Sequence, residues 1–152
     1  MVRLVLAVAC LVPFTAFGGT AGDIARAVRE TTDKATRIEL NCDRTILNAD
    51  GEDIAVVSAS VKDLRGRSVP VADNLIEFEV MGEGELLGVG NGDPSSHESD
   101  KASHRRLFNG LCMALVQTSQ KAGDIKITAR SSGLASGSIV LKTKRAKLRP
   151  SA

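Results

Sequence analysis

The stretch that decides the fold is Ile54–Asp63, which reads IAVVSASVKD. Apolar side chains occupy every second position from Ala55 to Val61, and from Ser58 onward the positions between them are polar. This period of two is that of a β-strand with one buried face and one face in water. A strand of this kind needs an apolar layer opposite its buried face, so Ile54–Asp63 predicts a sheet packed on a second sheet.

The same alternation recurs on both sides of this stretch, in short segments separated by turns rich in Gly, Asn and Asp. We expect strands within residues 36–47, 74–82, 84–90, 104–108, 111–117, 123–130 and 136–143. Asn109-Gly110 is typical of the tight turn of a hairpin, and 111–116 is apolar on both faces, as in a central strand. Only residues 23–30 suggest a helix. The pattern predicts an all-β fold, an antiparallel β-sandwich of seven or eight strands.

Composition excludes some functions. The chain has 152 residues and a net charge of +2, which is too small to indicate nucleic acid as a partner. It contains no Trp and no Tyr, and its aromatic residues are Phe14, Phe17, Phe78 and Phe108. Single-stranded nucleic acids and sugar rings both bind on flat aromatic side chains. A nucleic-acid function is therefore not expected, and a carbohydrate-binding module is disfavoured.

The N-terminus has a basic residue, Arg3, then a mostly apolar run, then small residues before Asp23. This order predicts that residues 1–22 are a secretory signal peptide, which would make the protein secreted or periplasmic. A remnant of a preceding domain and an uncleaved anchor stay open as alternatives. The run is shorter than the ~20 residues of a membrane-spanning helix and contains Pro13, so no stable membrane span is expected. We assign residues 23–35 to a linker, 36–143 to the sandwich and 144–152 to a basic tail.

The segment LLGVGNGDPSSHESD, residues 86–100, gathers the polar side chains that a metal or catalytic site would need. The candidates for metal ligands are Asp93, His97, Glu98 and Asp100. Their spacing does not match an EF-hand and Pro94 interrupts it, so we expect no metal. A catalytic pair of Asp93 with His97 or His104 lacks a nucleophile elbow beside Ser95, Ser96 or Ser103. We therefore expect no catalytic residue.

A structural role for this segment explains its composition better. Gly88, Gly90 and Gly92 permit unusual backbone angles or close approach. Asn91 and Asp93 can accept hydrogen bonds from loop amides, and His97 and Glu98 can tie the loop to Arg105 or Arg106. We predict a self-bonded loop that contacts a neighbouring domain. Its interface residues are Gly90, Asn91, Gly92, Asp93, Pro94, His97 and Glu98.

Two cysteines, Cys42 and Cys112, would remain after removal of a signal that contains Cys10. Buried free thiols are the favoured interpretation. A disulfide in an oxidising compartment stays open, because the sequence does not show whether the two residues are close.

Three stretches carry a resemblance to a known family. They are DGEDIAVVSASVKDLRGRSVP (50–70), GVGNGDPSSHE (88–98) and FNGL (108–111). In this order and spacing, within roughly residues 35–141, they resemble a C-terminal immunoglobulin-like domain of glycoside hydrolase family two β-galactosidases. The resemblance implies an immunoglobulin-like sandwich that packs on or spaces a catalytic domain. Its partners would be the catalytic and neighbouring domains of a glycoside hydrolase, in cis or in trans.

The resemblance assigns no catalytic residue to this chain. Family-two enzymes use two carboxylates in a (β/α)₈ barrel of ~250 residues, whereas this chain is shorter and does not alternate strands with helices. We therefore expect no catalytic residue, no cofactor and no enzymatic activity of the chain on its own. A bacterial immunoglobulin-like spacer of adhesin or invasin type is the main alternative, because it shares the pattern of residues 50–70.

Overall fold

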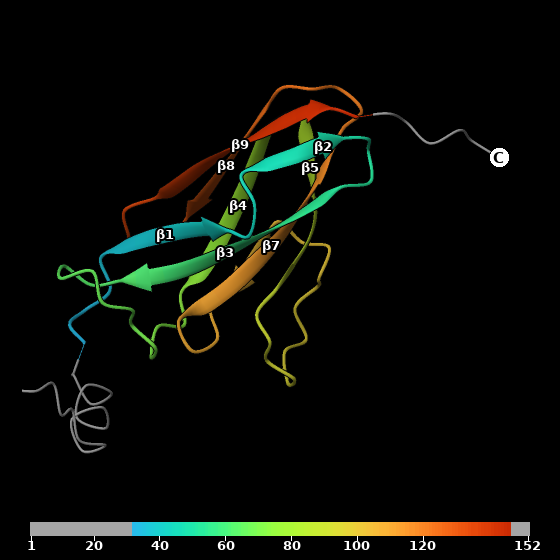
Figure 1. Cartoon of the computed structure of the whole chain (residues 1–152). Coiled ribbons are helices and arrows are strands. Elements are labelled where there is room, and N and C mark those ends of the chain that lie inside the picture. The colour runs from blue at the N-terminus through green and yellow to red at the C-terminus, as the bar shows by residue number, and fades with distance from the viewer. Residues whose placement is uncertain (1–31, 147–152) are drawn as a thin grey trace, which may run out of the picture. The chain divides into compact units, whose positions relative to one another are not determined.

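The computed structural model describes residues 32–146, which form nine strands and no helix (Figure 1). The signal peptide predicted at 1–22, the helix suggested at 23–30, most of the linker and the end of the tail at 147–152 lie outside the described residues. No helix that could cross a membrane occurs within residues 32–146. The strands are β1 Arg37–Cys42, β2 Ile46–Ala49, β3 Ile54–Lys62, β4 Leu75–Gly82, β5 Gly84–Gly90, β6 His104–Arg106, β7 Leu111–Thr118, β8 Asp124–Arg130 and β9 Gly137–Arg145.

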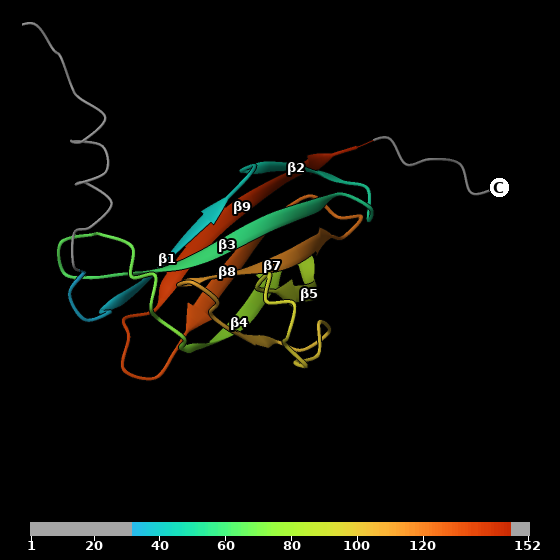
Figure 2. The same cartoon turned by 90° about the horizontal axis from the view of Figure 1, so that it is seen from below.

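The strands make two sheets that pack face to face, as the two views show (Figures 1 and 2). The four-stranded sheet has the order β1-β3-β7-β5, and the five-stranded sheet has the order β2-β9-β8-β4-β6. Neighbouring strands are antiparallel except for β2 and β9, which run parallel. The predicted all-β sandwich is confirmed.

The structure corrects the predicted strand count within residues 36–47. This segment forms two strands, because the chain leaves β1 at Cys42 and enters the other sheet as β2. Asp43 marks the change: its backbone N–H donates to Val56 O at 3.3 Å, and its carboxylate accepts from Val56 N–H at 3.2 Å. The side chain thus ends the ladder with β3, and β2 then pairs with β9.

The hairpin predicted at Asn109-Gly110 is only partly present. Both residues have positive φ, 52° and 74°, and Phe108 and Leu111 exchange backbone hydrogen bonds of 2.9 and 3.1 Å, as in a type I′ turn. The flanking strands do not form a ladder, because β6 pairs with β4 in one sheet and β7 with β3 and β5 in the other. The turn therefore carries the chain between sheets. The central position predicted for residues 111–117 is confirmed, since β7 lies between β3 and β5.

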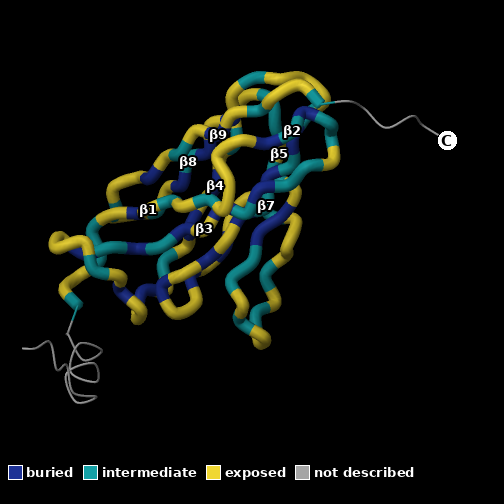
Figure 3. Tube along the Cα trace, in the orientation of Figure 1, coloured by how far each residue is buried: buried dark blue, intermediate teal, exposed yellow. Residues whose placement is uncertain are grey.

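The core lies between the two sheets and is built by the alternating positions (Figure 3). The side chains at the alternating positions of β3, from Ala55 to Val61, are fully buried, as the sequence predicts. The opposite sheet contributes larger side chains, and the largest fully buried ones include Leu47, Ile76, Ile125, Ile127 and Leu141. Burying one such side chain contributes roughly 1.5–3 kcal/mol relative to leaving it exposed. These contacts hold the two sheets together.

The cysteines are free thiols, as the favoured interpretation predicts. Cys42 pairs with Val57 on one side of β3, and Cys112 pairs with Ala59 on its other side. Two strand spacings amount to about 10 Å, beyond the Cα separation of about 7 Å that a disulfide tolerates. Burial raises the pKa of the Cys112 thiol to about 12, so this side chain behaves as a small core residue.

A fully buried carboxylate, Asp63, fixes the connection that follows β3. Its oxygens accept hydrogen bonds from the backbone N–H groups of Arg65 and Arg67 at 2.9 Å and of Asp33 at 3.2 Å. The Arg67 guanidinium lies 2.8 Å from it and also contacts the carboxylate of Asp33 at 3.0 Å. Burial alone would raise the pKa of Asp63, but these hydrogen bonds and the Arg67 charge outweigh it and lower the pKa to about 2.

This arrangement predicts acid sensitivity. The pKa of Asp63 is lower in the folded state, about 2 against an ordinary 3.8, so its ionised form favours folding at neutral pH. That stabilisation is complete above about pH 4 and is lost as the pH falls through the folded pKa. Urea unfolding midpoints are expected to decrease steeply from about pH 4 to about pH 2. In Asp63→Asn the decrease over this window should be shallower, although the variant is less stable at neutral pH. An equal slope in both proteins would contradict this role of Asp63.

Candidate functional site

The loop between β5 and β6, residues 91–103, connects edge strands of the two sheets and projects beyond them (Figure 1). It hydrogen-bonds to the backbone of both sheets. Val89 N–H on β5 donates to Asp100 O at 2.7 Å, and Phe78 N–H on β4 donates to Ser103 O at 2.8 Å. An unprotected edge strand invites unwanted strand pairing, so the loop covers β5 where it would otherwise be open.

Arg105 on β6 organises this loop from inside, with its side chain 6% exposed. Its guanidinium donates to Glu98 O at 2.9 Å, to the Asp100 carboxylate at 3.0 Å and to Asn91 Oδ1 at 3.2 Å. Its Nε lies 3.7 Å from the Glu98 carboxylate and makes no hydrogen bond. A buried guanidinium is costly unless such partners surround it, so the loop conformation and the Arg105 position depend on each other.

Short-range hydrogen bonds shape the first half of the loop. Asn91 Oδ1 accepts from Asp93 N–H at 3.1 Å, and Asp93 accepts from the N–H and the hydroxyl of Ser95 at 2.9 and 2.7 Å. The hydroxyl of Ser95, followed by its N–H, holds the pKa of Asp93 below its usual range. Gly92 has φ 74°, and a Cβ on Gly88 would lie 2.8 Å from Asp100 O. The capping roles of Asn91 and Asp93 and the need for glycine at 88 and 92 are thus confirmed. Gly90 does not need to be glycine for either reason, because its φ is not positive and a Cβ there would meet only the Met113 side chain at 3.8 Å.

The two arginines suggested as anchors of the loop both contact Glu98 but differ in burial. Glu98 contacts both, because its carboxylate accepts from Arg106 N–H at 3.0 Å and also lies near the side chains of Arg105 and Arg106. Arg105 is buried beneath the loop, whereas the Arg106 side chain is 61% exposed. His97, which was predicted to share this role, is exposed, and no hydrogen bond ties it to either arginine. The role of Asp100 on Arg105 was not predicted.

The four candidate metal ligands do not converge. Asp93 is bonded to Ser95, Glu98 to Arg106 N–H and Asp100 to Arg105. Within residues 32–146 no three His, Cys, Asp or Glu side chains come together as a metal site would require. Among the residues proposed for a catalytic pair, His104 lies on β6 opposite Glu77, and the Ser95 hydroxyl donates to Asp93 at 2.7 Å.

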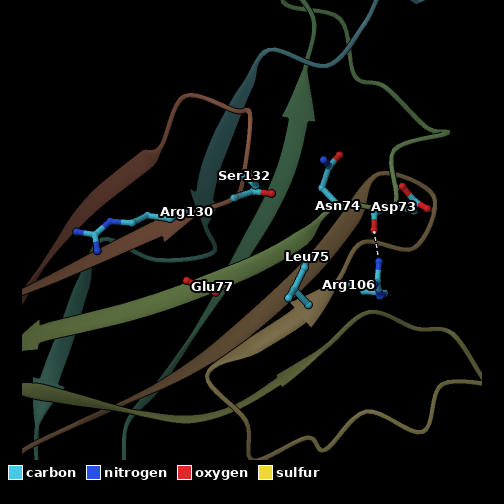
Figure 4. A pocket seen from close by; sticks show the side chains of 8 residues that line it. Asp73, Asn74, Leu75, Glu77, Arg106, Arg130 and Ser132 are labelled. Atoms are coloured by element: carbon cyan, nitrogen blue, oxygen red, sulfur yellow. Dashed lines mark hydrogen bonds between the residues drawn. The ribbon is translucent and has the colours of Figure 1, made fainter.

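A second concave region lies where β4 begins and β8 ends (Figure 4). It is an open hollow of about 580 Å³, with Asp73, Glu77, Arg106 and Arg130 on its walls. Arg106 donates to Asp73 O at 3.5 Å, and Arg130 contacts Glu79 outside the hollow at 3.0 Å. These four side chains are exposed. Glycoside hydrolysis uses two carboxylates that flank the bound sugar. Asp73 and Glu77 both line this hollow, but it is open to solvent and both side chains are exposed.

Apart from Gly90, which ends β5, the predicted interface residues divide into two groups. Asn91, Asp93 and Glu98 use their polar atoms inside the loop, as described above. Gly92, Pro94 and His97 are exposed at its surface. The arrangement is a projecting loop whose polar side chains are bonded within the loop and to β6 and whose outer surface is exposed.

Comparison with known proteins agrees with this picture. Residues 38–140 match the family model described as glycoside hydrolase family 2 C-terminal domain 5. The β-galactosidase BoGH2A of Bacteroides ovatus is 44% identical over 104 residues, which are 68% of this chain and 12% of that protein. A crystal structure of a glycosyl hydrolase family 2 member from Bacteroides cellulosilyticus superposes with a TM-score of 0.74 at 32% identity, over 76% of this chain and 15% of that one.

The chain thus spans about an eighth of the length of the B. ovatus relative. The D00-D0 domain of intimin superposes with a TM-score of 0.52 at 17% identity, a likeness in fold alone. The sandwich is therefore immunoglobulin-like, as the resemblance implied. With a family model that matches most of the described residues, this chain belongs to the glycoside hydrolase family 2 C-terminal domain 5 family.

Proposed function

We propose that this chain is a non-catalytic accessory domain that docks on a neighbouring domain of a family 2 glycoside hydrolase of β-galactosidase type. The observation that carries the proposal is the loop 91–103. A buried arginine bonds to it from inside, and its tip, with Pro94 and His97, is exposed. A rigid projecting loop loses little conformational entropy on docking, which favours its use as a contact.

The absence of chemistry is supported by the site geometry. Within residues 32–146, the carboxylates of the loop are engaged by Arg105, Arg106 and Ser95, and the second hollow is open and lined by exposed side chains. The sugar hydrolysis would belong to other domains of the enzyme. The basic and apolar start of the chain supports export of the protein from the cytoplasm as a further part of the proposal.

A spacer role is the second candidate. Its support is the fold shared with the intimin domain, whose sequence is too different to indicate function. A spacer holds other domains apart without resting on them, whereas a docked domain is stabilised by its neighbour. A carbohydrate-binding role has weaker support, because the chain has no Trp or Tyr and Phe108 is the only exposed aromatic residue among those described.

Exchanging this domain into a related enzyme distinguishes a domain that docks on its neighbour from a domain that acts as a spacer. Residues 38–140 would replace the matching segment of the B. ovatus β-galactosidase, and scanning calorimetry would compare the sandwich transition with that of the full-length isolated chain. Docking is expected to raise this transition by at least about 4 °C, equivalent to about 1 kcal/mol for a domain of this size. A fusion to an unrelated protein through the same linker controls for tethering. A transition at the temperature of the isolated chain would favour the spacer.

A further inference from the structure

The outer faces of the two sheets differ in charge. The outer face of the five-stranded sheet carries charged side chains along three of its strands, namely Glu77, Glu79, Lys126, Arg130, Lys142 and Lys144. On the outer face of the four-stranded sheet, the residues paired with Leu111, Met113 and Leu115 of β7 are uncharged, and Glu85 is the charged side chain at the far end of β5, opposite Gln117. Interface cores are depleted in charged residues, so the second face has the composition of a contact surface.

An apolar strip runs along β7 at the centre of this face. Leu111 is 51% exposed and Met113 is 39% exposed, and Leu115 follows on the same side of the strand. Their partners on β3 are Ser60, Ser58 and Val56, and those of Met113 and Leu115 on β5 are Gly90 and Gly88. The serines are short and the glycines have no side chain. The strip therefore stands out from an uncharged and nearly flat surface.

A groove lies beside this strip, on the side of the loop. It is about 550 Å³ in volume and open to solvent, and its walls include Leu87, Leu115, Asp100 and Lys101. Leu87 is 43% exposed at a register shift in β5, where the strand bulges between Leu86 and Gly88. The bulge turns a large apolar side chain toward the groove. The groove joins the apolar strip to the loop as one continuous surface.

We propose that the outer face of β3, β7 and β5, with the adjoining groove, is the docking face of the domain. This inference rests on the proposed function and names the surface used. The occupant is a neighbouring domain of the same glycoside hydrolase chain, through an uncharged apolar surface that covers Leu111 and Met113 and inserts an apolar side chain beside Leu87. The loop 91–103 borders this contact.

The size of the face favours a tethered neighbour over a second copy of this chain. Three strands of about seven residues cover roughly 14 by 24 Å, or about 340 Å². A standard interface buries about 800 Å² on each partner. Two free copies joined through this face would fall well short of that area. A domain linked in the same chain needs less contact, because the linker supplies a high effective concentration.

Matched lysine substitutions test which face docks. They are made in the exchanged enzyme, which is the B. ovatus β-galactosidase carrying residues 38–140 of this chain. Leu111→Lys alters the proposed face, and Val140→Lys alters the outer face of the five-stranded sheet, at side chains 51% and 50% exposed. In the full-length isolated chain both variants should unfold within about 2 °C of wild type, as surface substitutions do. In the exchanged enzyme, Leu111→Lys is expected to abolish the stabilisation of the sandwich by its neighbour, while Val140→Lys retains it.

Each other outcome overturns a defined part of the account. If the unmodified exchanged enzyme shows no stabilisation, the proposed docking function fails. If stabilisation is present and survives Leu111→Lys, the docking function stands and the assignment of the face is wrong. Loss of stabilisation in Val140→Lys alone would place the contact on the five-stranded sheet. Sedimentation that shows a dimer of the isolated chain, broken by Leu111→Lys, would make the occupant a second copy.

Discussion

Leu141→Ala is expected to lower the free energy of unfolding by about 3 kcal/mol, within the range of about 2–5 kcal/mol for leucine truncation in a core. Leu141 lies on β9, pairs with Ile125 on β8 and is fully buried between the sheets. The substitution removes apolar surface from the core and leaves a cavity that the close-packed strands cannot fill. Denaturant unfolding monitored by circular dichroism measures the loss.

The adjacent residue provides the control. Val140 is 50% exposed on the opposite face of β9, so Val140→Ala is expected to cost less than about 1 kcal/mol. The contrast between neighbouring positions tests the two-layer arrangement directly, because only one face of the strand meets the other sheet. Equal losses at both positions would show that β9 is not packed as described.

Arg105→Met is expected to destabilise the protein by about 3 kcal/mol, at the lower end of the range for breaking a buried ion pair. The lower end applies because Asp100, one of its partners, is 83% exposed and can be hydrated when the guanidinium is gone. Asn91 Oδ1 and Glu98 O would each lose the hydrogen bond that Arg105 donates. Hydrogen exchange should then increase at the Val89 amide, whose acceptor is Asp100 O.

Arg106→Met is the matched control for this prediction. The Arg106 side chain is 61% exposed, and its contact with Glu98 is 3.7 Å long. Exposed ion pairs contribute about 0–1 kcal/mol, so the substitution should leave both the stability and the exchange at Val89 nearly unchanged. If Arg106→Met lowered the free energy of unfolding as much as Arg105→Met, the buried Arg105 would not be the residue that holds the loop in place.

The burial pattern of the strands could be predicted because it depends on local geometry. Alternation from Ala55 to Val61 makes one face apolar whatever the partner strand is, and the whole set is buried. The choice of sheet could not be predicted in the same way. Residues 36–47 divide between the sheets where Asp43 bonds to Val56, a contact across thirteen positions that no periodicity contains.

The loop shows the same division between local and distant contacts. The bonds that Asn91 and Asp93 accept from loop amides reach only two residues along the chain, so residue type alone predicts them. The bond from Arg105 to Asn91 spans fourteen positions and is not local. The choice between Arg105 and Arg106 depends on which face of β6 points inward, and two adjacent arginines carry no alternation that decides it. The role of Asp100 follows from loop closure onto β5, which involves both sheets at once.

The central claim is that this chain contributes structure to a glycoside hydrolase and no chemistry of its own. The most direct measurement is turnover of a chromogenic galactoside by the purified full-length chain, with a heat-killed sample as control. The account predicts release no faster than in that control. Turnover above the control that follows the protein through purification would contradict it.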